Sequence, residues 1–387
     1  MSHERARFTE LDLFRYLTVT IAICAHIVSH HSIYEGLGSP QSAYLLNAVT
    51  RIGTPSLLIL FGMMAEIVYA RRFNEDRLRT VSQLIYRAFI CYLAFVSIAF
   101  LEQIMVSLEP AKFVGALILV SKSVAGNIFK LYAIYLILLP IVLVIRQRTG
   151  LSGVLAFGAA CWLVGHYIFQ SIPELPRPAH HIGGLLLGIG NNWGPSVLQG
   201  MLLIVAGMVL GNALFSRQRE HGARLLAAIL LIGSIGAVAW NLSTLGWWSV
   251  VSNIADASEW RSHNHIGYFS YGLIATSVIV AISKALQLIL PARLATTLAT
   301  LGGATLPYFY LSNIILLLTP GAPVAGLLPT LAIFALYLVL FGGLTLAWLK
   351  TGRDSGAMVR LNREAPLAIA NWLRRIRGQQ LSSTLDQ

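Results

Sequence analysis

The sequence predicts an all-α integral membrane protein, a bundle of about ten transmembrane helices. The chain of 387 residues is 56% hydrophobic and only 11% charged, and its apolar residues form long blocks. Blocks of about 20 apolar residues have the length that an α-helix needs to cross a bilayer. The ten-residue alternating segments of a membrane β-barrel are absent, so a helical bundle is the spanning structure that satisfies the backbone. The predicted spans are residues 11–31, 53–70, 84–106, 127–145, 152–170, 195–214, 224–242, 266–286, 301–318 and 326–348.

The distribution of basic residues predicts that both termini are cytoplasmic. With the N-terminus inside, most of the 28 Lys and Arg residues fall in the inner loops and the C-terminal tail. The positive-inside rule and the even number of spans both agree with this orientation. The net charge of +12 is therefore explained by membrane topology, and nucleic acid is not an expected partner. The outer connections contain Arg51, Lys112, Lys122, Arg177 and Arg261.

The loops are too short for a separate soluble domain, so any chemistry belongs to the bundle itself. We expect one ten-helix membrane domain over residues 1–350 and a cytoplasmic tail over residues 351–387. The longest outer connections are residues 32–50, 172–194 and 243–265, and residues 107–126 are a candidate re-entrant or interfacial segment. In the tail, a basic amphipathic helix is predicted on the cytoplasmic leaflet. Its apolar face comprises Ile369, Trp372, Leu373 and Ile376, and its basic residues are Arg374, Arg375 and Arg377.

The first predicted span contains two residues that a bilayer disfavours, Arg15 and His26. An Arg at the membrane centre costs at least ~2.5 kcal/mol on insertion scales, so it needs a partner, a wet cavity or a function. The two residues are eleven positions apart, which is three helical turns plus about 20°, so they share one face about 16 Å apart. We expect Arg15 on the cytoplasmic side of the bundle and His26 in its outer half.

Further charged residues are predicted at the level of Arg15. Asp12, Glu66 and Arg87 all fall near inner ends of spans, so these residues and Arg15 are expected to form one charged layer. Two arginines facing one or two carboxylates leave cationic capacity for an anion, and Arg suits bidentate phosphate contacts. A closed ion-pair network that locks three helices together is an equally good interpretation.

The outer level combines histidines with other polar residues. His26, His30 and His31 are joined there by Glu102, Lys130 and His166. A neutral imidazole in a partly buried site can act as a general base for a hydroxyl, and we expect His26 in this role with Glu102 as a candidate to orient it. Asp12 lies about 21 Å from His26 by helix rise, so we expect it to pair with Arg15 or Arg87 instead.

No metal site or bound cofactor is expected from the sequence. His26 and His30 form an i, i+4 pair, but no HExxH pattern is present and no Cys or carboxylate lies at ligand spacing. A serine nucleophile elbow, a Walker loop and a dinucleotide GxGxxG motif are also missing. Cys24, Cys91 and Cys161 all fall in predicted spans, where they are expected to be small buried residues.

Several segments resemble the acyltransferase family 3 membrane proteins, which transfer acyl groups to sugars and other acceptors. LDLFR at 11–15, followed by ten residues and His26, resembles the LDGLR…H signature of the family's first helix. PSLLILFGM at 55–63 resembles its PxFFxLSGF motif, with Phe61 where Ser is usual. Arg87 matches one member of an R-x-x-R pair, whose other member is replaced by Leu84.

Two later segments extend the resemblance over nearly the whole chain. LGGATLPYFYLSN at 301–313 is similar to LGRxSLPxYLLH, with Asn313 where His is common, and KLYAIYLILLP at 130–140 looks most like the subgroup that succinylates periplasmic glucans. The family has ten helices and cytoplasmic termini.

The resemblance implies a membrane-bound O-acyltransferase of the bacterial inner membrane. Its donor would be cytoplasmic acyl-CoA carrying an acetyl or succinyl group, and its acceptor a hydroxyl of a periplasmic, cell-surface or lipid-linked glycan. Arg15 and Arg87, with Asp12 and Glu66, would serve donor binding, and His26 and Glu102 would be catalytic. The acceptor-side candidates are His30, Lys130, His166 and Asn313.

Alternatives to the direct transfer remain open. A covalent acyl-His26 intermediate is a variant that would give ping-pong kinetics. A transporter or a lipid or glycan flippase would use the charged layers as substrate and coupling sites. A non-catalytic scaffold in an envelope-polymer export complex is a third interpretation. Membrane lipids are expected partners in each case, and the identity of the acyl group, the acceptor and the oligomeric state are left open.

Overall fold

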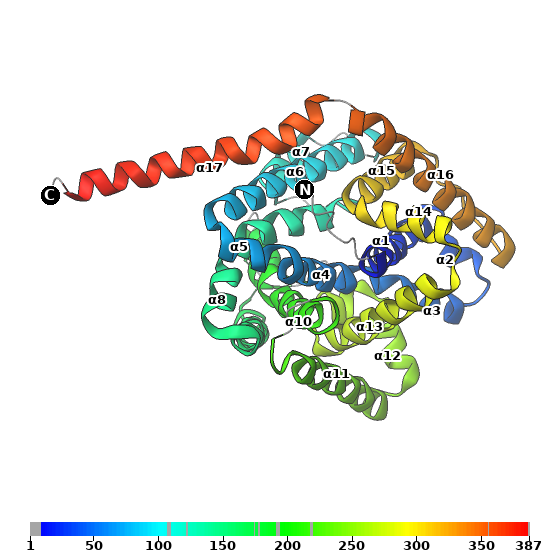
Figure 1. The fold of residues 1–387 in the computed structure, drawn as a ribbon. Coiled ribbons are helices and arrows are strands. Elements are labelled where there is room, and N and C mark those ends of the chain that lie inside the picture. The colour runs from blue at the N-terminus through cyan, green and yellow to red at the C-terminus, as the bar shows by residue number, and fades with distance from the viewer. Residues whose placement is uncertain are drawn as a thin grey trace.

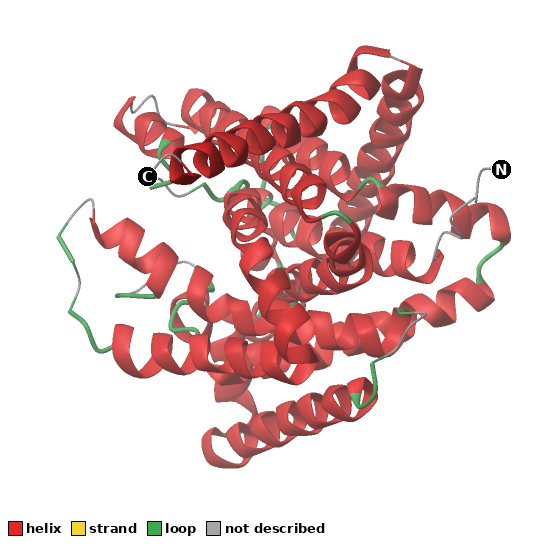
Figure 2. Ribbon diagram, turned by 60° about the vertical axis from the view of Figure 1, so that its left-hand side comes forward, coloured by secondary structure: helices red, strands yellow, loops and turns green. Residues whose placement is uncertain are grey.

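The computed structural model describes residues 9–106, 110–120, 123–173, 175–176, 179–190, 194–216, 220–354 and 356–385, and these residues form helices without any strand (Figure 2). Lys122 and Arg177 lie outside the described residues, as do the side chains of Lys112 and Arg377. The elements, with η marking π-helical turns, are α1 (Thr9–His30), α2 (Ile33–Gly36), α3 (Pro40–Arg51), α4 (Gly53–Met64), η1 (Ala65–Ala70), α5 (Arg71–Glu75), α6 (Arg77–Val106), α7 (Pro110–Leu117), α8 (Asn127–Val164), η2 (Gly165–Phe169), α9 (Ala179–Leu187), α10 (Val197–Phe215), α11 (Ala223–Leu245), α12 (Trp247–Ala255), η3 (Ala257–Arg261), α13 (Ile266–Ile289), α14 (Ala292–Gly303), α15 (Thr305–Leu318), α16 (Leu327–Asp354) and α17 (Gly356–Leu385).

The described residues contain eight helices that are long and apolar enough to cross a membrane, or nine if the bent pair α14 and α15 is one span. The structure thus supports a multi-pass helical membrane protein, while the count of ten stays a prediction. The predicted spans 127–145 and 152–170 share one element label, Asn127–Phe169, but they lie on either side of a break within it. Gly150 interrupts this element with φ 73° and ψ −171°, a conformation that non-Gly residues avoid.

The predicted span 301–318 also differs from the structure. The helix axis bends by 81° between α14 and α15, so the apolar segment is divided at Ala304. Helix α14 begins at Ala292, nine residues before the predicted start, and its last turn contains Gly302 and Gly303. Two adjacent glycines weaken a helix because they lose the most backbone entropy on folding, which is consistent with a break at this position.

The predicted outer connections are partly helical. Residues 32–50 contain α2 and most of α3, residues 172–194 contain α9, and residues 243–265 contain α12 and η3. Helix α7 occupies the candidate re-entrant segment. The predicted tail helix is present as α17, which packs against α6 through a hydrogen bond of 2.8 Å from Tyr86 Oη to Asn362 Oδ1 and then extends away from the bundle (Figure 1).

The centre of the bundle is the close packing of α4 against α10. A Cβ atom on Gly62 would lie 1.8 Å from the carbonyl oxygen of Ile204, and one on Gly207 would lie 2.1 Å from that of Ile59. The two backbones therefore meet directly, as small residues allow in membrane helices. Helix α10 is buried along nearly its whole length, whereas α11 at the periphery is almost entirely exposed.

Helix α1 lies in the middle of the second half of the bundle, where it contacts α4, α13, α14 and α15 (Figure 1). Its first turns pack tightly on the end of α14, because a Cβ atom on Gly302 would lie 1.7 Å from the carbonyl oxygen of Asp12. Further along, Gly53 at the start of α4 packs against Ala22. A Cβ atom added to Gly53 would lie 3.0 Å from the Cα and Cβ atoms of Ala22. These contacts fix the depth and the rotation of the helix that carries Arg15 and His26.

Segments predicted on one side of the membrane contact each other in the structure. Arg146 of α8 bonds to Glu66 and Glu220, all of which are predicted inner residues. At the other end, Arg51 Nε donates to the carbonyl of Ala255, and Tyr268 Oη donates to the carbonyl of Arg51. Which end faces the cytoplasm stays a prediction.

Candidate functional site

Helices α1 and α15 run side by side in the same direction, and polar contacts join them along their length. Thr305 contacts Arg15, Tyr308 contacts Thr20 and Asn313 contacts His26, so positions advance together on the two helices. The rings of Tyr16 and Tyr308 stack at 5.9 Å between these levels. The α1 members of this α1–α15 seam are half-buried. The seam is formed by Arg15, Tyr16, Thr20, His26, Thr305, Tyr308 and Asn313.

Arg15 lies at the bend between α14 and α15. Its Nη1 is 3.0 Å from Asp12 Oδ1, and its Nη2 donates to Thr305 Oγ1 at 2.9 Å and more weakly to the Gly303 carbonyl at 3.5 Å. The carbonyl is one of the unpaired groups that a helix end leaves, and a cation is favourable there. The predicted pair of Asp12 and Arg15 is therefore present, and Arg15 also joins two helices.

Arg87 belongs to the same neighbourhood. Its guanidinium lies over the ring of Tyr69, 5.5 Å from the centroid, and its charge acts unfavourably on that of Arg15. Arg72, which follows η1, also acts electrostatically on Tyr69. The side chain of Arg87 is exposed and that of Arg72 is half-buried. Arg72 and Arg87 thus lie near Tyr69, and Arg87 is also near Arg15. Arg15 and Arg87 were predicted at this level from the sequence, but Arg72 was not.

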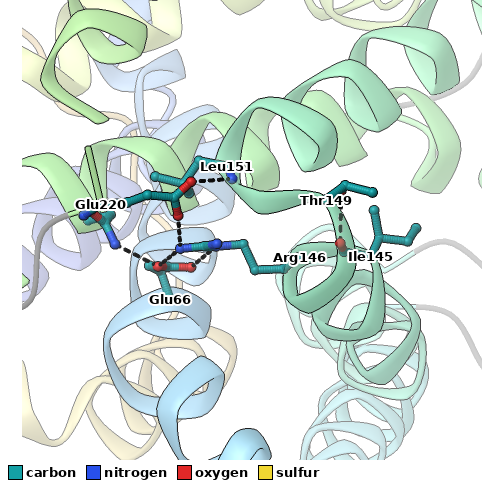
Figure 3. Close-up of polar contacts among 7 residues, drawn as sticks. Glu66, Ile145, Arg146, Thr149, Leu151 and Glu220 are labelled. Atoms are coloured by element: carbon teal, nitrogen blue, oxygen red, sulfur yellow. Dashed lines mark hydrogen bonds and ion pairs between the residues drawn. The ribbon is translucent and has the colours of Figure 1, made fainter. Parts of the chain in front are cut away.

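Glu66 is not part of this layer, which corrects the prediction that it pairs there. Its carboxylate accepts from Arg146 Nε at 3.0 Å and Nη2 at 2.8 Å, and from Asn212 Nδ2 at 2.8 Å. Arg146 also lies 2.7 Å from Glu220 Oε2, and Glu220 Oε1 accepts from the backbone N–H of Leu151 (Figure 3). We call Glu66, Arg146, Asn212 and Glu220 the Glu66 clamp. It forms a closed network beside the break in α8 at Gly150.

The departure of Glu66 changes the charge balance around Arg15. The structure places Asp12 as the acidic partner of Arg15, while Glu66 is shared between Arg146 and Asn212. The charges of Arg15 and Arg87 repel each other at this level. A closed ion-pair network is present at the Glu66 clamp, and the binding of an anion at the inner layer stays a prediction.

His26 is held by Asn313. The two side chains meet at 2.5 Å between His26 Nδ1 and Asn313 Oδ1, and the Asn313 amide in turn donates from Nδ2 to the carbonyl of Phe309 at 2.8 Å. The second bond fixes the orientation of the amide, so that an oxygen faces the imidazole. An amide oxygen can only accept, so Nδ1 carries the proton and Nε2 keeps its lone pair.

Glu102 does not orient His26, which corrects the second predicted pairing. Its Oε1 accepts from the backbone N–H of Ala125 at 2.9 Å, just before α8 begins. Asn313, predicted on the acceptor side, takes the orienting position instead. The ring of Phe309 lies 5.4 Å from the imidazole and forms the adjacent wall.

The other predicted acceptor-side residues differ in their distance from this site. Lys130 is buried on α8, with Nζ 5.3 Å from the ring of Phe95, and its neighbour Phe129 contacts Phe309 at 5.4 Å between centroids. His30 continues α1 one turn beyond His26 and packs edge-on against His31 at 4.9 Å.

His166 lies in a different environment from His26. It belongs to η2 and stacks on Trp162 with an interplanar angle of 10°, and Trp162 Nε1 donates to the carbonyl of Asn264 at 3.0 Å. Its charge interacts with that of His265 at the start of α13. We therefore assign it to the rim formed by η2 and η3 rather than to the α1–α15 seam.

Sequence reasoning missed Tyr16, Thr20, Thr305 and Tyr308 as site residues. Tyr16 and Thr20 lie about 80° and about 120° around α1 from His26, so the period that linked Arg15 to His26 did not mark them, and their nearness to Arg15 in the sequence was the available signal. The two α15 residues had no comparable signal, because one sequence does not show which helix packs beside α1.

Searches with this chain found no matching family model, no matching curated protein and no matching solved structure. Among the residues that the structure describes, no group of three His, Cys, Asp or Glu side chains is arranged to hold a metal ion.

Proposed function

We propose that this multi-pass membrane protein is an O-acyltransferase of the bacterial inner membrane, which transfers an acetyl or succinyl group from acyl-CoA to a glycan hydroxyl. The observation that carries the proposal is the α1–α15 seam. It connects a cationic cluster at Arg15 with a polarised imidazole at His26 on one continuous helix face. The two levels are about 16 Å apart by helix rise, roughly the length of an extended pantetheine arm.

The cationic level suits the donor. Arg15 is fixed by Asp12 and Thr305, so its guanidinium is preorganised, while exposed Arg87 provides a second fork for phosphate oxygens. An acyl-CoA bound with its phosphates here would extend its arm along Tyr16 and Thr20 toward His26. The acyl carbonyl would then lie beside the imidazole at the other end of the seam.

The imidazole level suits the chemistry. Nε2 of His26 accepts the proton of the acceptor hydroxyl as the oxygen attacks the thioester carbonyl, and the C–O bond forms. The C–S bond then breaks, and the CoA thiolate takes the proton from the imidazolium. Asn313 acts as a positioning residue, because its oxygen holds Nδ1–H and keeps Nε2 as the basic nitrogen. In the acyl-His26 variant, Nε2 would itself attack the thioester.

A transporter or flippase remains the second candidate, and one observation favours it. The 81° break between α14 and α15 places the N-terminal end of α15 beside Arg15, and N-terminal ends of broken helices bind anions in transporters. The sequence argued against a transporter because interrupted helices are missing from paired positions. The described residues contain one such bent pair, which weakens that objection without supplying the second break.

The two candidates differ in what the purified protein releases. In proteoliposomes supplied with acetyl-CoA or succinyl-CoA and a neutral glucan, an acyltransferase releases free CoA thiol and yields a glucan heavier by one acyl group. Mass spectrometry of the glucan and a thiol assay measure both products. Movement of labelled CoA ester or glycan across the bilayer without thiol release would instead establish transport and reject acyl transfer.

A further inference from the structure

Arg51 lies at the same end of the bundle as His26. Two residues after it, Gly53 packs against Ala22, which is one turn before His26 on α1. Arg51 Nε donates to the carbonyl of Ala255 at the end of α12, at 3.3 Å, and its own carbonyl accepts from Tyr268 Oη at 3.2 Å. Contacts to three neighbouring elements therefore hold its backbone and guanidinium in place.

Arg261, the last residue of η3, comes to the same region from another element. Its guanidinium packs against Gly194. A Cβ atom added to Gly194 would lie 3.2 Å from both Nε and Nη2 of Arg261. Gly194 also has a φ of 130°, which side chains rarely adopt. Both features require glycine at this position, so the local sequence leaves room for the Arg261 side chain.

The two guanidinium groups act on each other and on His26. The charges of Arg51 and Arg261 repel, and each also opposes a positive charge on the His26 imidazole. None of the ion pairs between described residues includes Arg51. Two cationic side chains therefore lie near His26.

We propose that Arg51 and Arg261 bind an anionic group, a phosphate or a carboxylate, on the substrate that reacts beside His26. Paired arginine forks match such groups, and an anion between them would relieve their mutual repulsion. The assignment of this anion to a substrate rests on the proposed acyl transfer, whereas the binding of the anion does not. The anion has two sources: a phosphate or carboxylate of the glycan acceptor, or the free carboxylate of a dicarboxylic acyl group.

The test uses the purified full-length protein and reads the modification of His26 itself. Diethyl pyrocarbonate adds to the free imidazole nitrogen, and peptide mass spectrometry measures the rate at His26 alone. Inorganic phosphate and succinate are the probes. An anion bound by Arg51 and Arg261 should slow the modification, and the concentration for half-protection should rise about tenfold in Arg51→Gln and in Arg261→Gln.

Matched variants separate this site from the inner cations and from misfolding. Arg87→Gln, at the inner level, should leave protection unchanged, and Arg51→Lys, which keeps a positive charge, should retain most of it. Protection by phosphate alone indicates a phosphorylated acceptor, and protection by succinate alone indicates a carboxylate. Absence of protection by both anions, equal protection in Arg51→Gln and Arg261→Gln, or loss of protection in Arg87→Gln would overturn the proposal. Because no turnover is measured, these outcomes are independent of whether the protein transfers acyl groups.

Discussion

The Glu66 clamp and the α1–α15 seam both contain an arginine beside a carboxylate, but they use it differently. In the clamp, Arg146 bonds to two carboxylates, and Asn212 and the Leu151 N–H satisfy further oxygen lone pairs. In the seam, Arg15 has one carboxylate partner, and a second arginine repels it.

The difference is the one expected between charges that fasten helices and charges that bind a ligand, which is the role proposed for Arg15 and Arg87. A closed network of this kind costs desolvation and is strongly destabilised when one partner is removed. A partly buried site in which arginines repel each other contributes little to the stability of the protein, and a bound anion would increase that contribution. Variants in the two regions should therefore change different measurable properties.

The largest effect is expected in the seam, on catalysis. His26→Ala removes the proposed general base, so the rate of acyl transfer should fall by about 10²–10⁴-fold. The thermal unfolding midpoint should change little, because the half-buried imidazole makes one hydrogen bond to another side chain. The measurements are the release of CoA thiol in proteoliposomes and the unfolding midpoint in detergent.

Ser29→Ala is the matched control for this variant. Ser29 lies on the same helix within one turn of His26, and its side chain is exposed. Its activity should equal that of the unmodified protein. Full activity in His26→Ala would remove the catalytic assignment, and equal loss in both variants would trace the effect to α1 as a whole.

The clamp should respond in the opposite manner. Arg146→Ala leaves Glu66 and Glu220 facing each other without their cation, and we expect it to destabilise the protein by about 3 kcal/mol. The value lies at the low end of the range for buried pairs, because the Glu220 side chain is 35% exposed. Unfolding by denaturant in detergent measures the change.

Arg148→Ala is the control, since that exposed arginine lies two residues further on in α8. A double variant of Arg146 and Glu66 should lose less stability than the sum of the two single variants, because the second change removes a charge that the first left unpaired. Strict additivity would show that the clamp does not couple its members.

The close packing of α4 against α10 positions two members of the clamp, because Glu66 follows α4 and Asn212 lies on α10. Gly62→Ala would place a methyl group 1.8 Å from a backbone oxygen, so the helices must separate, and we expect a loss of about 2 kcal/mol in stability. Gly233→Ala is a matched glycine in a helix where an added Cβ atom has nothing within 4 Å, and it should be neutral or slightly stabilising. If both variants unfold at the same midpoint, the tight crossing is not a source of stability.

The contrast between seam and clamp also shows what the sequence could and could not predict. Hydropathy located the helical membrane fold, because bilayer thickness imposes a length on each apolar segment. The helical period correctly placed Arg15 and His26 on one face, which both contact α15. These properties depend only on residues close in the chain.

Partner identities were less predictable, because they depend on the order of helices around the bundle. Glu66 and Arg15 are predicted at similar depth, yet Glu66 turns to Arg146 of α8. The π-helical turn η1 contributes, since it changes the rotation of the helix at Glu66 in a manner that the 3.6-residue period does not contain. Asn313 takes the orienting position predicted for Glu102 for the same reason, because the depth of a residue was predictable and the helix beside α1 was not.

A smaller effect is expected at the rim formed by η2 and η3, where His265 precedes α13. Its Nδ1 accepts from the Gly267 N–H at 3.1 Å, which caps the helix and requires an unprotonated nitrogen. Burial lowers the pKa of His265, and the nearby charges of His166 and His263 lower it further. The folded state therefore binds this proton less readily than the unfolded state, whose histidine pKa is about 6.5.

The stabilising effect of His265 is consequently present above about pH 6.5 and is lost as the pH falls below that value. Lowering the pH from about 7.5 to about 5.5 should reduce the thermal unfolding midpoint of the protein. His265→Asn keeps a side chain that can cap the helix but does not titrate, so the midpoint should depend less on pH in this variant. An unchanged pH dependence in His265→Asn would assign the effect to other groups. Since His26 lies in the seam, the same variant should retain the proposed acyl transfer, which would separate the histidine that stabilises α13 from the histidine proposed as the general base.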